Sequence, residues 1–318
     1  MRTLRIRKGK AFLAATSLLL LTACGGGEAS SGADKSVVLT VPTWAGGEAN
    51  AAVAKYLLEH ELGYDVTLKK MDEADAWKAI GTGKADAILE DWGRKEERRT
   101  WVDKKGTVVP AGSLGITGKM GWYVPSYLAA EHKDITDWKK LNRYAELFAK
   151  DGSGKGELLE GSREFLTHDE ELIDNLRLNY EPSYAGSEKA QLKEIRERAA
   201  KREPFLAYWW QPHWIGAEVE LTEVRLPAYY DGCAGEDVKK VTCGYPEDEL
   251  KKYLNADFSK NGGDAAEMLR NFQWSEDDQN KVAKRITDDG ITPEGAAKEW
   301  VEDNRGTWKM WLWGLDGE

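Results

Sequence analysis

The feature that most constrains the fold is a regular alternation of strand and helix patterns in the first third of the chain. Three short apolar or alternating runs, at 37–42, 64–70 and 85–89, are typical of strands in a sheet. Amphipathic patterns at 48–62 and 74–80 predict helices between them, and a glycine follows each helix. This order predicts a parallel sheet with right-handed crossovers. Ligands of such sheets bind beyond the carboxyl ends of the strands.

The remaining chain predicts a second α/β unit followed by a helical C-terminal third. Extended patterns at 108–125 and 219–226 lead into and out of this unit, and residues 205–210 form an apolar strand pattern. We therefore expect an α/β protein with two lobes and a hinge at two crossings, near 117–122 and 219–227. The expected helices in these regions are 138–150, 169–178, 187–202, 247–254, 263–272, 276–288 and 293–313.

The two expected lobes differ in continuity. Lobe 1 comprises residues 36–118 and 224–318, and lobe 2, residues 119–223, is inserted into it. Two connections of this kind allow a pair of lobes to close over a ligand that lies in the cleft between them.

The N-terminus has the pattern of an export signal. In residues 1–23 a basic stretch precedes an apolar one, which at 11–21 is about half the ~20 residues that a membrane-spanning helix needs. It leads to Leu21-Thr22-Ala23-Cys24, which resembles the bacterial lipobox, whose cysteine is lipidated. Residues 24–35, rich in Gly, Ser and Ala, predict a flexible tether. We expect a lipoprotein on the extracytoplasmic face of the cell membrane; the alternative is an ordinary secretory signal that contains a cysteine.

The other two cysteines are an even pair. Export into an oxidising compartment favours a disulfide between Cys233 and Cys243, with two unrelated buried thiols as the alternative. Neither has a histidine near it in the sequence, so a catalytic thiol is disfavoured.

Charge and composition exclude several classes of partner. The formal net charge of −10 argues against nucleic acid, because a surface that binds phosphates needs a basic field. Four His and three Cys leave little material for a metal cluster. We expect no metal and no cofactor.

Tryptophan is unusually abundant, with 14 residues. Trp44, Trp92 and Trp210 follow or end predicted strands, and Trp122 with Tyr123 lies at an inferred lobe crossing. Such positions can converge on a cleft between lobes. Indole faces bind cations that lack N–H donors, because a quaternary ammonium is attracted by the negative ring face and offers no conventional hydrogen bond. The pattern therefore predicts an aromatic cage for a quaternary amine.

Other tryptophans are assigned to packing. Trp209 and Trp210 should point to opposite sides of their strand, so we place Trp210 in the cleft and Trp209 in the core. The tryptophans on helical stretches are expected to pack against other elements; they are Trp77, Trp101, Trp138, Trp274, Trp300, Trp308, Trp311 and Trp313.

From about residue 36 to 313 the chain resembles the substrate-binding lipoproteins of ABC transporters for glycine betaine, choline and related osmoprotectants. The resemblance implies a two-lobed periplasmic-binding-protein fold of type II, with the ligand in the interlobe cleft. It implies cage tryptophans at Trp92 and Trp210. Choline-binding members add a Trp at the position of Trp44 and a Tyr from near Trp122 and Tyr123. The motifs that carry the resemblance are Trp44, 83–87 leading to Trp92, 121–125, and 208–214.

Two departures from the family pattern bear on the ligand. Some betaine binders place a cage Trp in the inserted lobe, where residues 156–162 here contain none. Choline binders have an Asp that contacts the ligand hydroxyl, and its position here is Gly46. A carboxylate ligand therefore fits better, held by backbone amides near Gly161 and Ser162 or by the side chains of Ser162 and His213. A capping or core role for His213 is equally open.

We thus expect a non-enzymatic solute receptor, glycine betaine or proline betaine being favoured over choline as its ligand. It is expected to be a monomer that delivers the ligand to a permease and ATPase of an ABC importer. The alternative is a carbohydrate-binding lipoprotein or glycosidase, because tryptophans also stack on sugars and Glu90-Asp91 is a candidate carboxylate pair. A sensing role instead of uptake would use the same ligand chemistry.

Overall fold

The structure is a computed structural model that describes residues 35–315 except 151, 153 and 234–237. The predicted signal peptide, Cys24 and the tether up to residue 34 lie outside the described residues. Within the described part of the chain, no helix has the length and apolar character needed to cross a bilayer.

The first third of the chain forms the predicted alternation. Strand β1 pairs in parallel with both β2 and β3, so the carboxyl ends of all three strands lie at one edge of the sheet. The two predicted helices are present, with ends that differ by one to three residues from the prediction. Asp72 caps the second helix by accepting a hydrogen bond from Asp75 N at 2.8 Å. The elements are β1 (Ser36–Val41), α1 (Ala45–His60), β2 (Asp65–Lys70), α2 (Glu73–Gly81) and β3 (Ala87–Asp91), and then α3 (Lys95–Arg98) and a π-helical turn (Arg99–Lys104).

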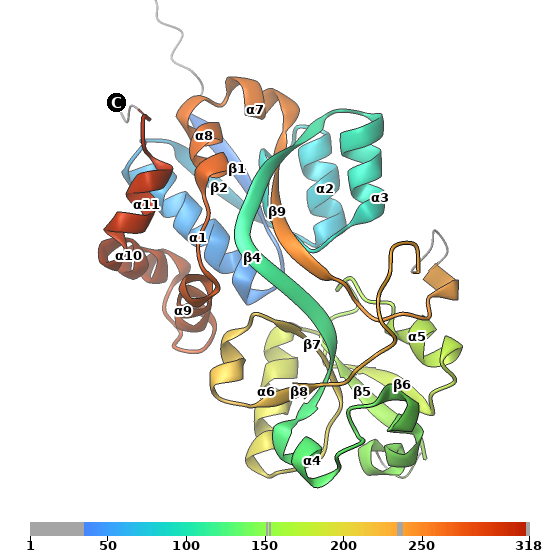
Figure 1. The fold of residues 1–318 in the computed structure, drawn as a ribbon. Coiled ribbons are helices and arrows are strands. Elements are labelled where there is room, and N and C mark those ends of the chain that lie inside the picture. Colours follow the sequence, from blue (N-terminus) through green and yellow to red (C-terminus); the bar gives the residue numbers. More distant parts are fainter. Residues whose placement is uncertain (1–34, 151, 153, 234–237, 316–318) are drawn as a thin grey trace, which may run out of the picture. The chain divides into compact units, whose positions relative to one another are not determined.

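Two long antiparallel strands continue the sheet. β4 (Val108–Pro125) pairs with β9 (Glu247–Asn255) along its first part. Along its last part it pairs with β7 (Ala207–Gln211) and β8 (Leu221–Glu223). β9 also pairs with β3. Figure 1 shows β4 and β9 side by side, running from the α2–α3 side of the sheet toward β7 and β8.

The helix expected over 247–254 is therefore wrong, since these residues form β9. Its residues have a helix-like charge pattern, but the strand fills the space between β3 and β4. Its last four residues, 252–255, are all buried there. Tertiary pairing has overridden the local preference.

The second α/β unit extends the same sheet, whose strand order is β2-β1-β3-β9-β4-β7-β5-β6, with β8 paired to β4. The helix expected at 138–150 is instead two 3₁₀ segments, Trp138–Tyr144 and Glu146–Phe148. The other elements are α4 (Ser126–Glu131), β5 (Gly156–Glu160), α5 (Asp169–Asn175), β6 (Tyr180–Tyr184), α6 (Glu188–Ala200), β7 (Ala207–Gln211), a 3₁₀ turn (Trp214–Ala217), β8 (Leu221–Glu223) and a 3₁₀ turn (Val238–Lys240).

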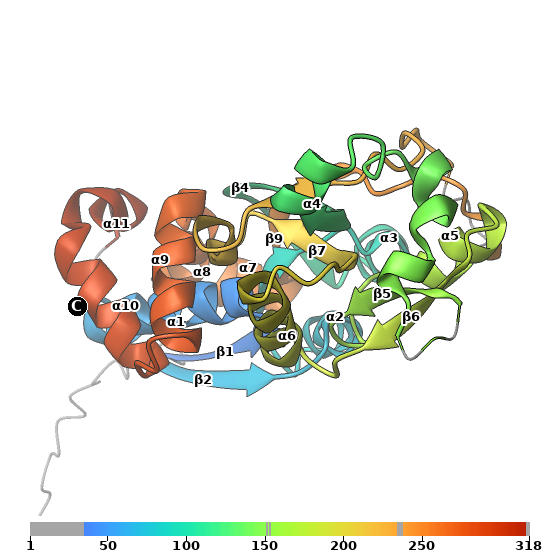
Figure 2. The ribbon, with the colours of Figure 1, turned by 90° about the horizontal axis from the view of Figure 1, so that it is seen from below.

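The C-terminal helices complete the core around α1. Figure 2 shows α9 and α10 beside α1, and the contacts of these helices agree. Trp274, Trp300, Trp308 and Trp311 are buried there, as expected for packing, but Trp313 is 78% exposed and packs against little. The helices are α7 (Ala256–Asn261), α8 (Gly263–Asn271), α9 (Glu276–Thr287), α10 (Pro293–Asp303) and α11 (Arg305–Trp311).

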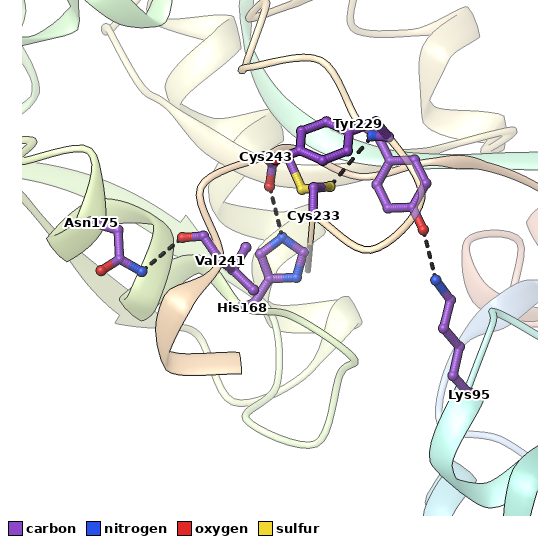
Figure 3. Close-up of a disulfide and its surroundings, with 8 residues drawn as sticks. Lys95, His168, Asn175, Tyr229, Cys233, Val241 and Cys243 are labelled. Atoms are coloured by element: carbon purple, nitrogen blue, oxygen red, sulfur yellow. Dashed lines mark hydrogen bonds between the residues drawn. A yellow bond between two sulfur atoms is a disulfide. The ribbon is translucent and has the colours of Figure 1, made fainter. Parts of the chain in front are cut away.

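The predicted disulfide between Cys233 and Cys243 is confirmed, with a Cα–Cα distance of 6.1 Å. Figure 3 shows Cys243 and Val241 beside His168 and Asn175 of the second unit. The His168 ring is hydrogen-bonded to Cys243 O at 3.3 Å, and Asn175 Nδ2 donates to Val241 O at 2.7 Å. The segment before β9 is thus attached to α5.

Candidate ligand-binding site

One cavity lies where the carboxyl ends of the first strands meet the second unit. The first strands, the middle of β4, the loop after β5 and strand β7 all contribute to its wall. The lining residues are Trp44, Glu73, Trp92, Met120, Phe165, Leu166, Tyr208 and Trp210.

The structure brings together three of the tryptophans that the sequence singled out. Trp44 follows β1 and immediately precedes α1, and Trp92 follows β3. Because β1 and β3 are parallel neighbours, their carboxyl ends place both indoles at the same edge of the sheet. Trp210, from β7, lines the cavity with them.

The β7 side of the cavity is a group of stacked and edge-on rings. The Trp210 ring lies 6.2 Å from Tyr208 and 5.6 Å, edge to face, from Phe165. Trp209 stacks on Trp210 with 4.5 Å between ring centroids. Trp209 is outside the lining and buried, as expected, but its ring has turned back onto Trp210 instead of pointing away from it.

Glu90, on β3, holds two of the cavity indoles by their N–H groups. Its Oε1 accepts hydrogen bonds from Trp44 Nε1 at 2.6 Å and from Trp92 Nε1 at 2.7 Å. Its Oε2 accepts from Asn50 Nδ2 at 2.5 Å and from Gln279 Nε2 at 2.7 Å. The residue is 3% exposed, and burial raises the pKa of its carboxyl although all four hydrogen bonds oppose the shift.

Glu73 is the one ionisable acid in the cavity wall. Its carboxylate accepts from Trp92 N at 3.1 Å and pairs with Arg94 Nε at 2.8 Å. Burial, followed by the neighbouring Asp91 carboxylate, raises the pKa of Glu73 to about 7 against the effect of Arg94. Its two oxygens accept hydrogen bonds from Trp92 N and Arg94 Nε, so both already have partners within the protein.

Trp122 and Tyr123 do not line this cavity. Trp122 is fully buried in the core of the second unit, and its Nε1 donates to Asp169 Oδ1 at 2.7 Å. Tyr123 is 1% exposed, and burial, followed by the Glu223 charge, raises the pKa of its hydroxyl. Both lie on the covered part of β4 between β7 and β8, which places them in the interior.

Gly161, Ser162 and His213 also lie outside the lining. Gly161 packs against the Phe165 ring, because a Cβ added to Gly161 would come 2.4 Å from that ring. Ser162 Oγ accepts from Glu164 N at 3.2 Å, and the next helix begins only at Asp169, so the backbone amides near Gly161 and Ser162 are not those of a helix N-terminus.

His213 has the capping role that the sequence left open. Its Nδ1 accepts from Ile215 N at 3.1 Å, at the start of the 3₁₀ turn. Its Nε2 is hydrogen-bonded to Glu188 Oε1 at 2.8 Å.

Five lining residues were missed by sequence reasoning: Glu73, Met120, Phe165, Leu166 and Tyr208. Tyr208 carried a signal, because it lies two residues before Trp210 on the same strand and so shares its face. Phe165 occupies the inserted region where no Trp was found, but a lone Phe in a loop gives no comparable pattern.

The carboxylates Glu90 and Asp91 do not form the catalytic pair that a glycosidase needs. Glu90 is enclosed by the four donors described above, whereas Asp91 accepts from Trp77 Nε1 at 3.2 Å and has Arg98 at 3.9 Å. Among the described residues there is also no cluster of His, Cys, Asp and Glu that could hold a metal ion.

Comparisons with known proteins agree on one family. Residues 35–303 match the family model OpuAC, the substrate-binding domain of ABC-type glycine betaine transport systems. A trimethylamine N-oxide-binding protein of Pelagibacter ubique is 26% identical, over 94% of this chain and 98% of its own.

Two solved structures share the two-lobed fold. Lactococcal OpuAC, closed on glycine betaine, has 22% identity, a TM-score of 0.68, and coverage of 87% of this chain and 99% of its own. A choline-binding protein in complex with choline has 18% identity, a TM-score of 0.72, and coverage of 90% and 94%. The chain has the α/β fold of type II periplasmic binding proteins and belongs to the family of substrate-binding domains of ABC-type glycine betaine transport systems.

Proposed function

We propose that this protein captures a compact quaternary amine in the cavity described above and delivers it to the permease of an ABC importer. The observation that carries the proposal is the convergence of five aromatic rings on one small cavity that no Lys or Arg side chain lines. Ring faces bind a methylated cation through its diffuse charge and its methyl groups. The protein acts as a receptor and not as an enzyme.

The energetics of such a cage suit a solute receptor. Each ring contributes about 0.5–2 kcal/mol, so five rings approach the ~8 kcal/mol of micromolar binding. Burial of the ligand's methyl groups supplies further free energy, at about 0.8 kcal/mol for each CH₂-sized group.

Glycine betaine and proline betaine are the leading ligands. Choline binders have an acid at the position of Gly46. A Cβ added to Gly46 would come 3.2 Å from the Gln279 side chain, so little space remains there for a side chain that would bind a hydroxyl. Trimethylamine N-oxide is the second candidate, because the relative from Pelagibacter is named for it. It carries the same trimethylated nitrogen and needs less room beyond the cage.

A sugar ligand is disfavoured by the polar groups of the wall. Sugar sites pair stacking rings with several side chains that hydrogen-bond hydroxyls. Here the lining contains one charged residue, Glu73, and both of its oxygens are already engaged by Arg94 and Trp92.

The wall of the cavity supports the two-lobe division. We propose that Trp44, Glu73 and Trp92 belong to lobe 1 and Phe165, Tyr208 and Trp210 to lobe 2, so that the ligand lies between the lobes. The contacts of Val241 and Cys243 with α5 favour a return to lobe 1 at β9 instead of at residue 224.

We further propose that Cys24 is lipidated and holds the protein, as a monomer, on the extracytoplasmic face of the membrane. Export and anchoring fit a receptor that passes its ligand to membrane-embedded subunits. Cys24→Ser should release the protein from washed membranes into the medium; continued membrane association would contradict the anchor.

Calorimetric titration of the purified protein tests the function. Glycine betaine, proline betaine, trimethylamine N-oxide, choline and an oligosaccharide would each be titrated under the same conditions. We expect tight binding of at least one betaine and none of the oligosaccharide. Binding of the oligosaccharide alone would refute the proposal.

A further inference from the structure

Glu90 is a buried carboxylate whose hydrogen-bond partners are all neutral. Two indole N–H groups and two side-chain amides donate to it at 2.5–2.7 Å. None of the ion pairs between described residues involves Glu90. Burial raises the pKa of its carboxyl, but both oxygens accept hydrogen bonds from N–H donors, which is the arrangement of an ionised carboxylate. Isolated buried charges are costly, so a buried carboxylate normally has a cation nearby.

Two other buried carboxylates close to the cavity each have a cation nearby. Glu73 is paired with Arg94 at 2.8 Å, and Asp91 lies 3.9 Å from Arg98. Glu90 differs from them in its neighbours, since it lies directly behind Trp44 and Trp92, whose rings line the cavity.

We propose that Glu90 is a specificity-determining residue whose negative charge, held at the N–H edges of Trp44 and Trp92, is the counter-charge of the ligand's cation. The inference rests on the proposed function and adds to it the reason why the cage selects a cation over a neutral group of the same shape.

The hydrogen-bond geometry gives Glu90 two effects. An anion that accepts from an indole N–H polarises the ring and makes its face more negative, which strengthens its attraction for a cation. The charge also acts directly on the cation through an interior of low dielectric constant, where attraction between opposite charges is much stronger than in water.

The hydrogen bonds also fix the orientation of both rings, and that effect must be separated from the effect of charge. Loss of ring orientation would weaken the binding of any ligand of the right shape. Loss of charge would weaken the binding of a cation alone. The useful measurement is therefore the ratio of two affinities.

The test uses glycine betaine and 3,3-dimethylbutanoate, in which carbon replaces the charged nitrogen and the shape is kept. Affinities for wild type, Glu90→Gln and Glu90→Asp would be measured by calorimetry and, for weak binding, by competition. Glu90→Gln keeps the length and a carbonyl that can accept from the indoles but removes the charge. Glu90→Asp keeps the charge but shortens the reach to the indoles.

We expect Glu90→Gln to weaken glycine betaine binding about 10- to 50-fold. Binding of 3,3-dimethylbutanoate, which has the same carboxylate but an uncharged tert-butyl group in place of the ammonium, should not weaken by more than about threefold. Glu90→Asp should weaken both ligands together and keep most of the wild-type ratio. Two results would overturn the proposal and leave Glu90 a purely structural role. One is an equal loss of affinity for both ligands in Glu90→Gln. The other is a loss of the preference for glycine betaine over 3,3-dimethylbutanoate in Glu90→Asp but not in Glu90→Gln.

Glu157→Gln is the matched control, because it removes a buried carboxylate from another strand, β5. Glu157 pairs with Arg198, and neither residue lines the cavity, so the affinity ratio should stay near the wild-type value. Near-ultraviolet circular dichroism would confirm that each variant is folded. If wild-type protein binds none of the quaternary amines, the proposed function is wrong. If it binds glycine betaine, the results for the variants test only the role of Glu90.

Discussion

At the scale of single residues, the neighbours of an indole decide what it does. Trp92 presents its ring to the cavity and gives its N–H to Glu90. Trp300 instead packs between other rings, 5.3 Å from Trp274 and 5.6 Å from Trp311, and gives its N–H to Asp278 at 3.0 Å. The two tryptophans should respond differently to the same substitution.

We predict that Trp92→Leu and Trp210→Leu each weaken betaine binding about 5- to 150-fold. Leucine keeps an apolar lining but removes the ring face, which costs roughly 1–3 kcal/mol of cation–π attraction and packing. Phenylalanine at the same positions should cost less, because a weaker ring face remains. Calorimetric titration of each variant measures the change.

Trp300→Leu is the control for these variants. It removes an equally large buried ring at a distance from the cavity, so it should lower thermal stability and leave affinity nearly unchanged. If the two cavity variants bound a betaine as tightly as wild type, their assignment to the cage would be wrong.

The sequence could predict the part of the cage that depends on strand order alone. Trp44 and Trp92 follow neighbouring parallel strands, so their proximity follows from the βαβ pattern. Phe165 reaches the cavity from a loop whose path no local pattern encodes. Trp122 was misplaced for a related reason, because its burial depends on strands that are distant in the sequence.

Lys252 offers a residue-scale test of stability. It is fully buried, its ammonium donates to Arg270 O at 2.7 Å and to Phe272 O, and burial lowers its pKa to about 7. An unfolded lysine titrates near 10.4. Between these values the unfolded chain binds more protons, so this group's contribution to the free energy of unfolding rises with pH and is smallest below pH 7.

We predict that Lys252→Met becomes less stable relative to wild type, in free energy of unfolding, as pH rises. From pH 6.5 to pH 9.5, the free energy of unfolding of wild type should increase by about 2–3 kcal/mol relative to that of the variant. Urea denaturation at the two pH values measures this change, and Lys251→Met, at the partly exposed neighbouring position, is the control. The same difference at both pH values in Lys252→Met would show that the buried amine does not titrate in this range.

At the scale of elements, the N-terminus of α1 is capped by a residue from another helix. Trp44 is the N-cap residue and makes no side-chain cap, whereas Glu188, at the start of α6, accepts from Ala45 N at 2.8 Å. Glu188 also contacts His213. A carboxylate at a helix N-terminus is favourable, and here it joins α1, beside the cage, to α6 on the other side of the cavity.

We predict that Glu188→Ala weakens ligand binding about tenfold and speeds dissociation, because this contact can form only when α1 and α6 are together. A hydrogen bond to a charged group is worth roughly 1.5–3 kcal/mol. Stopped-flow competition gives the dissociation rate. Glu197→Ala, exposed on the same helix, should bind as wild type does; equal effects in the two variants would argue against a specific contact.

The elements also show where sequence patterns fail. Local periodicity sufficed for β1 to β3 and for the helices that cover them, because each has one buried face and clear end signals. It failed for β9, whose buried faces are set by β3 and β4, strands more than 100 residues earlier in the sequence. Strands that join distant parts of a chain are decided by tertiary pairing.

At the scale of the whole molecule, the cavity wall comes from both proposed lobes, which β4 and β9 connect. A ligand held by rings from both lobes binds more tightly when the lobes are closed around it than when they are apart. It therefore shifts the population of molecules toward the closed arrangement. Its contacts are enclosed, so salt should screen them far less than it screens surface ion pairs.

We therefore predict that a saturating betaine decreases the radius of gyration and that this change persists at 0.5 M salt. Small-angle X-ray scattering of the protein with and without ligand measures the change. Glycine, which has the carboxylate but no methyl groups, is the control solute and should leave the radius unchanged. In Glu188→Ala the same closure should need about ten times more ligand, because the contact that joins α1 to α6 is missing. A radius that stays constant while calorimetry shows binding would mean that the ligand enters a cavity already closed. The Glu188–Ala45 contact between α1 and α6 would then have no effect on affinity.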